Sequence, residues 1–403
     1  DAADMPIVVA GLFASIIAIV MTRRTPLAER IGVYTKGATD MNIMWMIWIF
    51  ILAGAFSNST KAMGAVDATV SLIMSVIPAE FLPAGIFVAA SLIALSIGTS
   101  VGTITLIAPI AVAISEGSGF SLPLCIGTVV GGAMFGDNLS FISDTTIAAC
   151  NGQGCQMKDK FRTNFMVVVP AAIATIGLIL ALSFNSQVTE IINKDYQMLQ
   201  ILPYILVLIS GIIGINVFLT LLIGIVSGSI IMLSTGSIAF SELLSNMGTG
   251  ASGMFETSMV AILVAALCGL IKYNGGFDAL LNGIRRVFKG KKSGQLGVGL
   301  LVGLMDIATA NNTVAIVMAN PIASEMAKDF DITPRKTASI LDTFSCIFQG
   351  ILPYGAQILV ALSVVNTLGY EMTAFQIISK LFYPMLLLLS SLLFIFVIPE
   401  KKK

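Results

Sequence analysis

The residues best suited to chemistry in this chain form one short polar run inside an apolar stretch. The run carries two carboxylates, four hydroxyls and an amide: Asp137, Asn138, Ser140, Ser143, Asp144, Thr145 and Thr146. Oxygen ligands of these kinds suit a hard cation such as Na⁺, and a carboxylate removed from water can trade a proton for a cation. Alternatively, the two aspartates only cap the halves of a broken helix, which is compatible with ion binding. We predict an ion- and proton-binding site here, with Na⁺ held at Asp137 and Asp144.

The composition places this run in a membrane protein. Hydrophobic residues make up 56% of the 403 positions, and only 11% are charged. A soluble domain carries about 25% charged residues. Continuous apolar runs that are long enough to cross a bilayer, or nearly so, recur along the chain. The sequence therefore predicts an all-α polytopic membrane protein.

The chain contains two related halves about 212 residues apart. Lys61–Ala68 recurs as Lys272–Ala279, and Pro109–Ala111 recurs as Pro321–Ala323. Paired hydrophobic segments that are interrupted at matching places are typical of transporters built from internal repeats. Because position 1 corresponds to about position 213, we expect the first repeat to lack one N-terminal span. The predicted division is a first repeat at 1–184, a linker at 185–198 and a second repeat at 199–403.

Positive charge orients the two repeats. Of the 22 Lys and Arg, 19 fall in five segments that we place on one side of the membrane: 22–40, 151–162, 272–295, 328–336 and 399–403. Positive loops stay cytoplasmic, so the C-terminus should be cytoplasmic and 185–198 should face outward. Loop 22–40 is basic, whereas its counterpart 234–253 has no Lys or Arg. The repeats are therefore predicted to be inverted.

Two pairs of short apolar arms are predicted to form re-entrant hairpins. Arms 296–309 and 314–327 lie between two basic loops, so they should enter and leave on the same side; arms 81–97 and 103–115 are their counterparts. Non-helical backbone at membrane depth persists only where it is buried in protein or lines a water-filled cavity. We therefore expect both tips, and the helices broken near 136–141 and 349–355, to converge near the middle of the membrane. The polar tip residues are Thr99, Ser100 and Thr103 in the first hairpin and Asn311, Asn312 and Thr313 in the second.

The counterparts of the acidic run are neutral. Gln349 falls opposite Asp137, and Gln349, Tyr354 and Gln357 supply hydrogen-bonding groups in place of charge. The negative charge is thus concentrated in one half, and the other half could hold an organic substrate.

Four other carboxylates lie in apolar or repeated segments. Asp306, on a hairpin arm, is a candidate second titrating group. Asp342 is expected to be a structural partner of a hydroxyl or a Lys. Asp67 and Asp278 recur in both copies after Gly, and we expect them to cap helices.

Several classes of function are excluded or weakly supported. The chain has no His, which excludes imidazole proton relays and His-ligated metals. We find no phosphate-binding loop and no nucleophile–base pair, so we predict no enzyme and no cofactor. The five Cys are scattered, and the pair Cys150 and Cys155 gives only weak support for a metal or redox site. The expected partners are the lipid bilayer, Na⁺ and H⁺, with no nucleic acid. A small organic solute and a second copy of the chain in a homodimer are two further partners that the sequence leaves open.

These motifs resemble a known family. Phe135–Thr146 resembles the G-D-x-x-S-P-x-S-D-T-T signature of the NhaC-type Na⁺/H⁺ antiporter family, with Phe141 at the Pro position. Gly98–Thr103 resembles its G-T-S-x-G-T hairpin, and Leu352–Gly355 resembles its P-W-containing broken helix, with Tyr354 at the Trp position. The resemblance implies inverted repeats with paired hairpins, in a family whose members include sodium/proton antiporters, carboxylate exchangers and amino-acid carriers.

Two hypotheses follow from these motifs. The first is a secondary active transporter that performs Na⁺/H⁺ antiport by alternating access across the cytoplasmic (inner) membrane. The alternative is a Na⁺- or H⁺-coupled transporter of an amino acid or a small carboxylate.

The predicted orientation can be tested by labelling single Cys residues in a chain without the native Cys. A Cys at position 290 should resist a membrane-impermeant thiol reagent added to intact cells, because its loop is basic. A Cys within 185–198 should react with that reagent. Labelling of position 290 from outside would contradict the assignment.

Overall fold

The computed structural model describes residues 7–22, 25–39, 41–65, 68, 72, 78–141, 143–186, 198–213, 215–235, 238–276, 279, 283, 287–288 and 290–397. All regular secondary structure within these ranges is helical, as predicted. Six of the described helical segments are long and apolar enough to cross a membrane, which is typical of a multi-pass membrane protein. The most apolar of them, Met157–Phe184, contains an 18-residue stretch with a mean hydropathy of 2.6, yet only 33% of that stretch is buried within the chain. Such a helix needs an apolar solvent, because so large an exposed apolar surface is unfavourable in water.

The helices before and after residues 187–197 form two series, which we call the first and the second half. The first half contains α1 (Ile7–Met21), α2 (Leu27–Ala38), α3 (Met41–Ala62), the 3₁₀ turn η2 (Ala79–Phe81), α5 (Leu82–Ile97), α6 (Ser100–Ser118), α7 (Leu122–Leu139), α8 (Asp144–Gln153) and α9 (Met157–Phe184). The second half contains α10 (Met198–Ile212), α11 (Val217–Ser234), α12 (Phe240–Gly253), α13 (Phe255–Tyr273), α15 (Lys291–Thr309), α16 (Asn312–Asp329), α17 (Pro334–Ile351), α18 (Ala356–Thr367), α19 (Ala374–Ile378) and α20 (Phe382–Phe396).

The helices that carry the polar residues begin at equivalent positions in the two halves. Helices α6 and α16 begin at Ser100 and Asn312, and helices α8 and α18 begin at Asp144 and Ala356, so each pair is offset by 212 residues. Helices α7 and α17 begin and end at the same offset. The offset read from the sequence thus also relates the ends of the helices.

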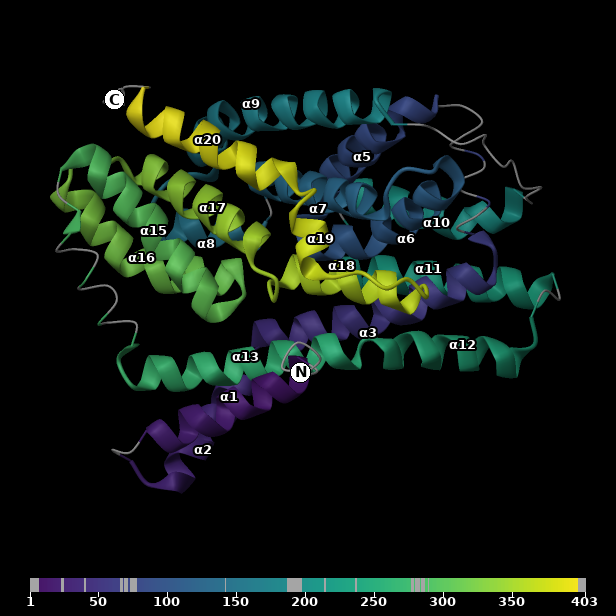
Figure 1. Ribbon diagram of the computed structural model, residues 1–403, viewed down its shortest axis with the longest axis horizontal. Helices are drawn as coiled ribbons and strands as arrows, with labels where there is room; N and C mark the ends of the chain where they lie inside the picture. The colour runs from purple at the N-terminus through teal and green to yellow at the C-terminus, as the bar shows by residue number, and fades with distance from the viewer. Residues whose placement is uncertain are drawn as a thin grey trace.

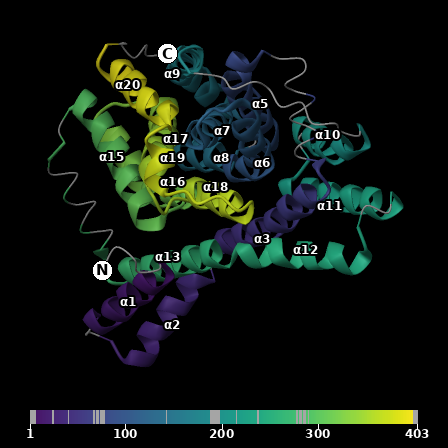
Figure 2. The same ribbon diagram turned by 45° about the vertical axis from the view of Figure 1, so that its right-hand side comes forward.

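The halves interlock through these same helices. Helix α8 of the first half packs on α16 of the second, and α18 of the second half packs on α6 of the first. Each broken helix therefore lies against a hairpin arm of the other half. In both views, α7, α8, α15, α16, α17 and α18 lie in one bundle, with α9 and α20 along its upper edge (Figures 1 and 2).

A layer of long helices lies along the lower side of this bundle. Helices α1, α2, α3, α12 and α13 run beneath it in both views (Figures 1 and 2). Helices α3 and α12 cross at Gly54 and Gly250, where a Cβ on Gly54 would lie 2.1 Å from the Gly250 carbonyl oxygen. Small residues permit such close approach of helices in a membrane.

Each hairpin turns within two residues, fewer than the sequence predicted. Gly98 (φ 76°) ends α5, and the Thr99 side chain accepts a hydrogen bond from the Gly102 amide at the start of α6. In the second hairpin, Ala310 (φ 51°) ends α15, and the Asn311 side chain accepts from the Val314 amide. A left-handed residue followed by a capping residue reverses the chain without leaving the first amides of the next helix unpaired.

The two helix breaks lie at 140–143 and 352–355, within or just after the predicted ranges. Pro353 accounts for the second break, because a residue that precedes proline is disfavoured in the helical region; Leu352 is extended at φ −84° and ψ 117°. The first break has no proline. There Ser140 and Ser143 are both extended, and the Ser140 hydroxyl donates to the Leu95 carbonyl of α5 at 2.9 Å.

Parts of the predicted topology were wrong or lie outside the described residues. The basic segment 22–40 is not a loop, because α2 occupies most of it and packs on α13. Lys336, counted as a loop residue, is a buried residue of α17 whose ammonium lies 4.5 Å from the centroid of the Phe394 ring. The sequence also predicts one final span at 374–398, but the described part of it is divided between α19 and α20. The sequence further predicts short amphipathic segments at 65–77 and 277–292; these lie mostly outside the described residues, as do Asp67 and Asp278.

The crossing of α3 and α12 generates a stability prediction. Gly54→Leu should lower the free energy of unfolding by about 1–3 kcal/mol, because the new side chain overlaps the backbone of α12. Gly177→Ala is the matched control, since a Cβ at Gly177 of α9 meets no atom within 4 Å. Thermal unfolding in detergent should separate the two variants; equal melting temperatures would contradict the close crossing.

Candidate functional site

A cavity of about 170 Å³ lies where both hairpin tips and both broken helices meet. The structure thus brings together four segments that the sequence predicted to converge. Helix α3 completes the wall with Trp45 and Ile49, which carried no signal in the sequence. Ten of the predicted site residues line the cavity: Thr99, Ser100, Asp137, Ser143, Asp144, Thr145, Asn311, Asn312, Thr313 and Gln357.

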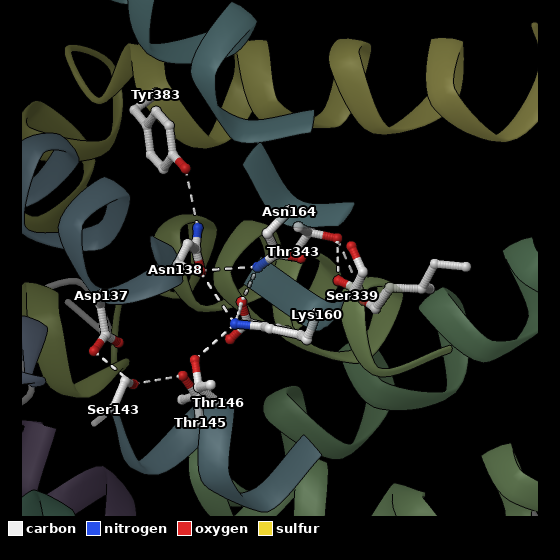
Figure 3. A network of polar contacts seen from close by, with 12 residues as sticks. Asp137, Asn138, Ser143, Thr145, Thr146, Lys160, Asn164, Ser339, Thr343 and Tyr383 are labelled. Carbon is white, nitrogen blue, oxygen red and sulfur yellow. Dashed lines mark hydrogen bonds and ion pairs between the residues drawn. The ribbon is translucent and has the colours of Figure 1, made fainter. Parts of the chain in front are cut away.

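The acidic side of the cavity is built around the first helix break. Asp137 lies in the last turn of α7, and its Oδ1 accepts a hydrogen bond from Ser143 Oγ at 2.8 Å. Ser143 Oγ also lies 2.8 Å from Thr145 Oγ1. Because the single proton of Ser143 is directed at the carboxylate, Thr145 must be the donor in that second contact. The two hydroxyls thus form an ordered chain that ends on Asp137 (Figure 3).

Asp144 is the first residue of α8, on the other side of the break. A carboxylate at this position interacts favourably with the positive end of the helix dipole. Two carboxylates, two hydroxyls and the tip residues Thr99 and Ser100 therefore offer oxygen atoms to one cavity. This donor set suits a hard cation.

The opposite side of the cavity carries amides. Gln357 is buried in α18, and its Nε2 donates to Ser100 Oγ at 3.0 Å, which links the second half to the tip of the first hairpin. Gln357 Oε1 has no hydrogen-bond partner among the described residues. Asn311 and Asn312 direct their side-chain oxygens to the first amides of α16. The cavity is therefore acidic on one side and neutral and polar on the other.

Four predicted residues support the first half of the site without lining the cavity. Asn138 Nδ2 donates to the Tyr383 hydroxyl of α20 at 3.0 Å, and Ser140 holds the break against α5. Thr103 Oγ1 donates to the Thr99 carbonyl at 2.9 Å, within its own hairpin. Thr146 Oγ1 accepts from Lys160 Nζ at 2.6 Å. These residues fix the positions of the tip and the break.

Three more predicted residues lie in the second half outside the cavity lining. Gln349 Nε2 donates to the Ala310 carbonyl at 2.9 Å, so the broken helix α17 binds the hairpin tip directly. The Tyr354 hydroxyl donates to the Ile307 carbonyl at 2.8 Å. Asp306 is wholly buried in α15.

A buried ion pair stands behind the acidic side. Lys160 Nζ lies 2.7 Å from Asp342 Oδ2, and their side chains are 1% and 0% exposed. The ammonium also donates to Thr146 Oγ1 and, at 3.1 Å, to the Asn138 carbonyl. Its three protons therefore have three acceptors. One cation thus joins α7, α8, α9 and α17 at the break (Figure 3).

Asn164 strengthens the same network. Its Nδ2 lies 2.7 Å from Asp342 Oδ2 and 2.9 Å from the Asn138 carbonyl. The Asn138 carbonyl, near the negative end of the α7 dipole, therefore receives hydrogen bonds from both an ammonium and an amide.

The sequence prediction was half right about this pair. Asp342 was expected to have a Lys or hydroxyl partner, and this is confirmed. Lys160, however, was counted in the cytoplasmic segment 151–162, whereas it is a buried residue of α9. The sequence did carry a signal: Thr163 and Asn164 follow Lys160 by three and four residues, so the three polar side chains share one face of a helix.

The ion pair generates a second stability prediction. Asp342→Asn should destabilise the protein by about 3–5 kcal/mol, because it leaves a buried ammonium without its counter-charge. The double variant Lys160→Met, Asp342→Asn should lose less. Asp331→Asn is the control, because its pair with Lys291 is exposed and spans 3.6 Å, and such pairs are worth about 0–1 kcal/mol. Melting temperatures in detergent measure all three; a double variant less stable than the single one would contradict the assignment.

Comparison with known proteins finds relatives that include named antiporters. A protein of Haemophilus influenzae that is named only as uncharacterized is 33% identical over 172 residues, covering 41% of this chain and 33% of that protein. The malate-2H(+)/Na(+)-lactate antiporter of Bacillus subtilis is 36% identical over 110 residues, covering 26% of this chain and 24% of that protein. The chain thus spans only about a third and a quarter of these two relatives.

A longer alignment covers most of the chain. The Na(+)/H(+) antiporter NhaC of Bacillus subtilis is 22% identical over 354 residues, which is 79% of this chain and 76% of that protein. The model of the Na⁺/H⁺ antiporter family matches residues 2–184 and 182–398, so that both halves are covered. The resemblance seen in the sequence motifs is thereby confirmed. The chain belongs to the Na⁺/H⁺ antiporter family, which is a family of transporters and not of enzymes.

Proposed function

We propose that this protein is a secondary active transporter that exchanges Na⁺ for H⁺ by alternating access across the cytoplasmic (inner) membrane. One observation carries the proposal: a single cavity collects both hairpin tips, both helix breaks and the carboxylates of Asp137 and Asp144. Ionisable groups at such a place in a membrane protein are costly and mark an ion pathway.

Na⁺ is proposed to bind between Asp137 and Asp144. Ser143 and Thr145 supply hydroxyl oxygens from the break, and Thr99 and Ser100 supply them from the hairpin tip. The nearby Lys160–Asp342 pair is neutral as a unit, so it orders the break without neutralising the two cavity carboxylates. A cation or a proton can therefore compensate their charge.

Alternating access is proposed to rest on two inverted repeats, 1–184 and 199–403, joined by the linker 185–198. The common register of the helix ends and the exchange of contacts between α8 and α16 and between α18 and α6 support this division. In this arrangement the hairpins enter from opposite sides, and the C-terminus is cytoplasmic. The homodimer that the sequence left open stays part of the proposal, and size measurement of the purified protein in detergent tests it.

Variants at the carboxylates test the site. Asp137→Asn and Asp144→Asn should each abolish Na⁺-driven proton movement in proteoliposomes, because each removes a negative charge from the cation shell while preserving shape. Asp67→Asn, at a position predicted from the sequence to cap a helix, should transport normally. If both cavity variants kept wild-type Na⁺ and pH dependence, the site assignment would be wrong.

The pH dependence of Na⁺ binding provides a separate test. A protonated carboxyl group does not bind Na⁺, so a proton and Na⁺ compete for the same oxygen atoms. Apparent Na⁺ affinity should therefore rise with pH, by about tenfold per pH unit in the range where one competing proton is being released. Isothermal titration of the purified protein at several pH values measures this. An affinity independent of pH would exclude direct competition at Asp137 and Asp144.

The alternative function, coupled transport of a small carboxylate, is supported by the amide side of the cavity. Asn311, Asn312 and Gln357 exceed what a bare cation requires. The cavity of about 170 Å³ is similar in size to one of about 150 Å³ that holds benzene, so a small organic solute fits. One relative is named as a malate and lactate exchanger, whereas none of the relatives described above is named as an amino-acid carrier. Stimulation of Na⁺ flux by malate or lactate inside the liposomes would favour this alternative.

A further inference from the structure

Besides Asp342, another buried carboxylate, Asp306, lies outside the cavity. Asp306 is 0% exposed, on the arm α15 and four residues before the left-handed Ala310 that ends this helix. Neither of its carboxylate oxygens has a hydrogen-bond partner among the described residues. Asp306 is also absent from the lining of the cavity. Its surroundings thus differ from those of Asp137, which lines the cavity and accepts from Ser143.

The facing helix α17 adds more unpartnered oxygen atoms. Ser345 lies beside Asp306, although its hydroxyl does not meet the geometry of a hydrogen bond. Gln349 follows one turn later, and its Oε1 also lacks a partner, while its Nε2 is bound to the Ala310 carbonyl. Among the described residues, four buried oxygen atoms of this interface lack a hydrogen-bond partner, which is unfavourable for a charged carboxylate unless a positive charge or a proton is supplied.

The repeat register relates this interface to the cation site. Asp306 corresponds to Ala94 of α5, and Gln349 corresponds to Asp137 of α7. A Cβ on Gly136 would lie 2.8 Å from the Ala94 Cβ, so position 94 packs against the turn that carries Asp137. Each half therefore has one carboxylate at the equivalent interface. It lies on the broken helix in the first half and on the hairpin arm in the second.

The titratable groups around Asp306 do not compensate a negative charge. They are the Cys346 thiol of α17, the Cys268 thiol of α13, which contacts the Ala308 carbonyl, and the Tyr354 hydroxyl, which binds the Ile307 carbonyl. Helices α16 and α20 also pack on α15, and no charged side chain of theirs is among the groups that act on Asp306. Within the described residues, a charged Asp306 would thus be a buried anion without a counter-ion.

We propose that Asp306 carries a proton of the exchange cycle at a site separate from the cation site at Asp137 and Asp144. A proton needs a single bond to one oxygen and no shell of ligands, which suits an interface outside the cavity. In this conformation Asp306 is the neutral acid, and rotation of its carboxyl group can direct the proton to Ser345. Release requires α15 and α17 to separate enough to admit water. The inference rests on the proposed Na⁺/H⁺ exchange and adds a second proton site to it.

Asp306→Asn tests this site because the amide has nearly the shape of the neutral acid but cannot release a proton. In proteoliposomes, the variant should retain exchange of radioactive Na⁺ for unlabelled Na⁺, while fewer protons move per Na⁺ than in the wild type, because only the protons that compete at Asp137 and Asp144 remain. Asp306→Glu should restore part of the proton movement. Asp329→Asn, an exposed carboxylate at the end of α16, is the matched control and should behave as wild type.

Two results would overturn the proposal. Wild-type proton movement in Asp306→Asn would show that the group carries no proton in the cycle. Loss of Na⁺-for-Na⁺ exchange together with proton movement, in a variant with a normal melting temperature, would place Asp306 in the cation site.

A spectroscopic measurement separates this inference from the proposed exchange. If the wild-type protein shows no Na⁺-driven pH change, the proposed function fails, and infrared difference spectroscopy still decides the state of Asp306. The carbonyl band of a protonated carboxyl group should persist at neutral pH in the wild type and disappear in Asp306→Asn. An unchanged band would refute the neutral Asp306.

Discussion

The buried pair between Lys160 and Asp342 is the interaction on which the rest of the site depends. A broken helix at membrane depth leaves carbonyl groups without partners, and unsatisfied backbone groups are costly there. The Lys160 ammonium meets this need at the Asn138 carbonyl and also binds Thr146 on the other side of the break. Asp342 then supplies the counter-charge from the other half of the chain. Because Lys160 and Asp342 already satisfy the polar groups at the break, the carboxylates of Asp137 and Asp144 remain available to bind an ion.

Much of the architecture could be predicted from the sequence because membranes restrict what a chain can do. Apolar runs must be helical, and polar interruptions must be buried or line a cavity. Gly98 and Thr99, Asn311, and Pro353 each have a local reason for ending or starting a helix, so the tips and the second break could be located closely. The first break could be placed from the polar run that interrupts an apolar stretch at 136–146. The Asp/Ser/Thr run is local in sequence, so most of its members could be proposed as cavity residues without a structure.

What could not be predicted depends on long-range packing. Lys160 was taken for a loop residue because charge counting cannot distinguish a solvated lysine from one that meets a carboxylate of a distant helix. Trp45 and Ile49 line the cavity only because α3 lies beside both hairpin tips, which no local pattern shows. The two carboxylate oxygens of Asp306 lack hydrogen-bond partners among the described residues because of how α15 packs against α17. No pattern in the sequence shows this.

The interlocking of the halves also has a consequence for biosynthesis. Asn164 and Asp342, which share the network of Lys160, are 178 positions apart in the chain. At the usual 5–20 residues per second, a ribosome needs roughly 10–35 s to cover that distance. Throughout this interval, α9 exists with its lysine but without the aspartate that neutralises it, and α8 exists without α16. The nascent first half must therefore keep Lys160 in contact with water, lipid headgroups or the insertion machinery until the ribosome has made the second half.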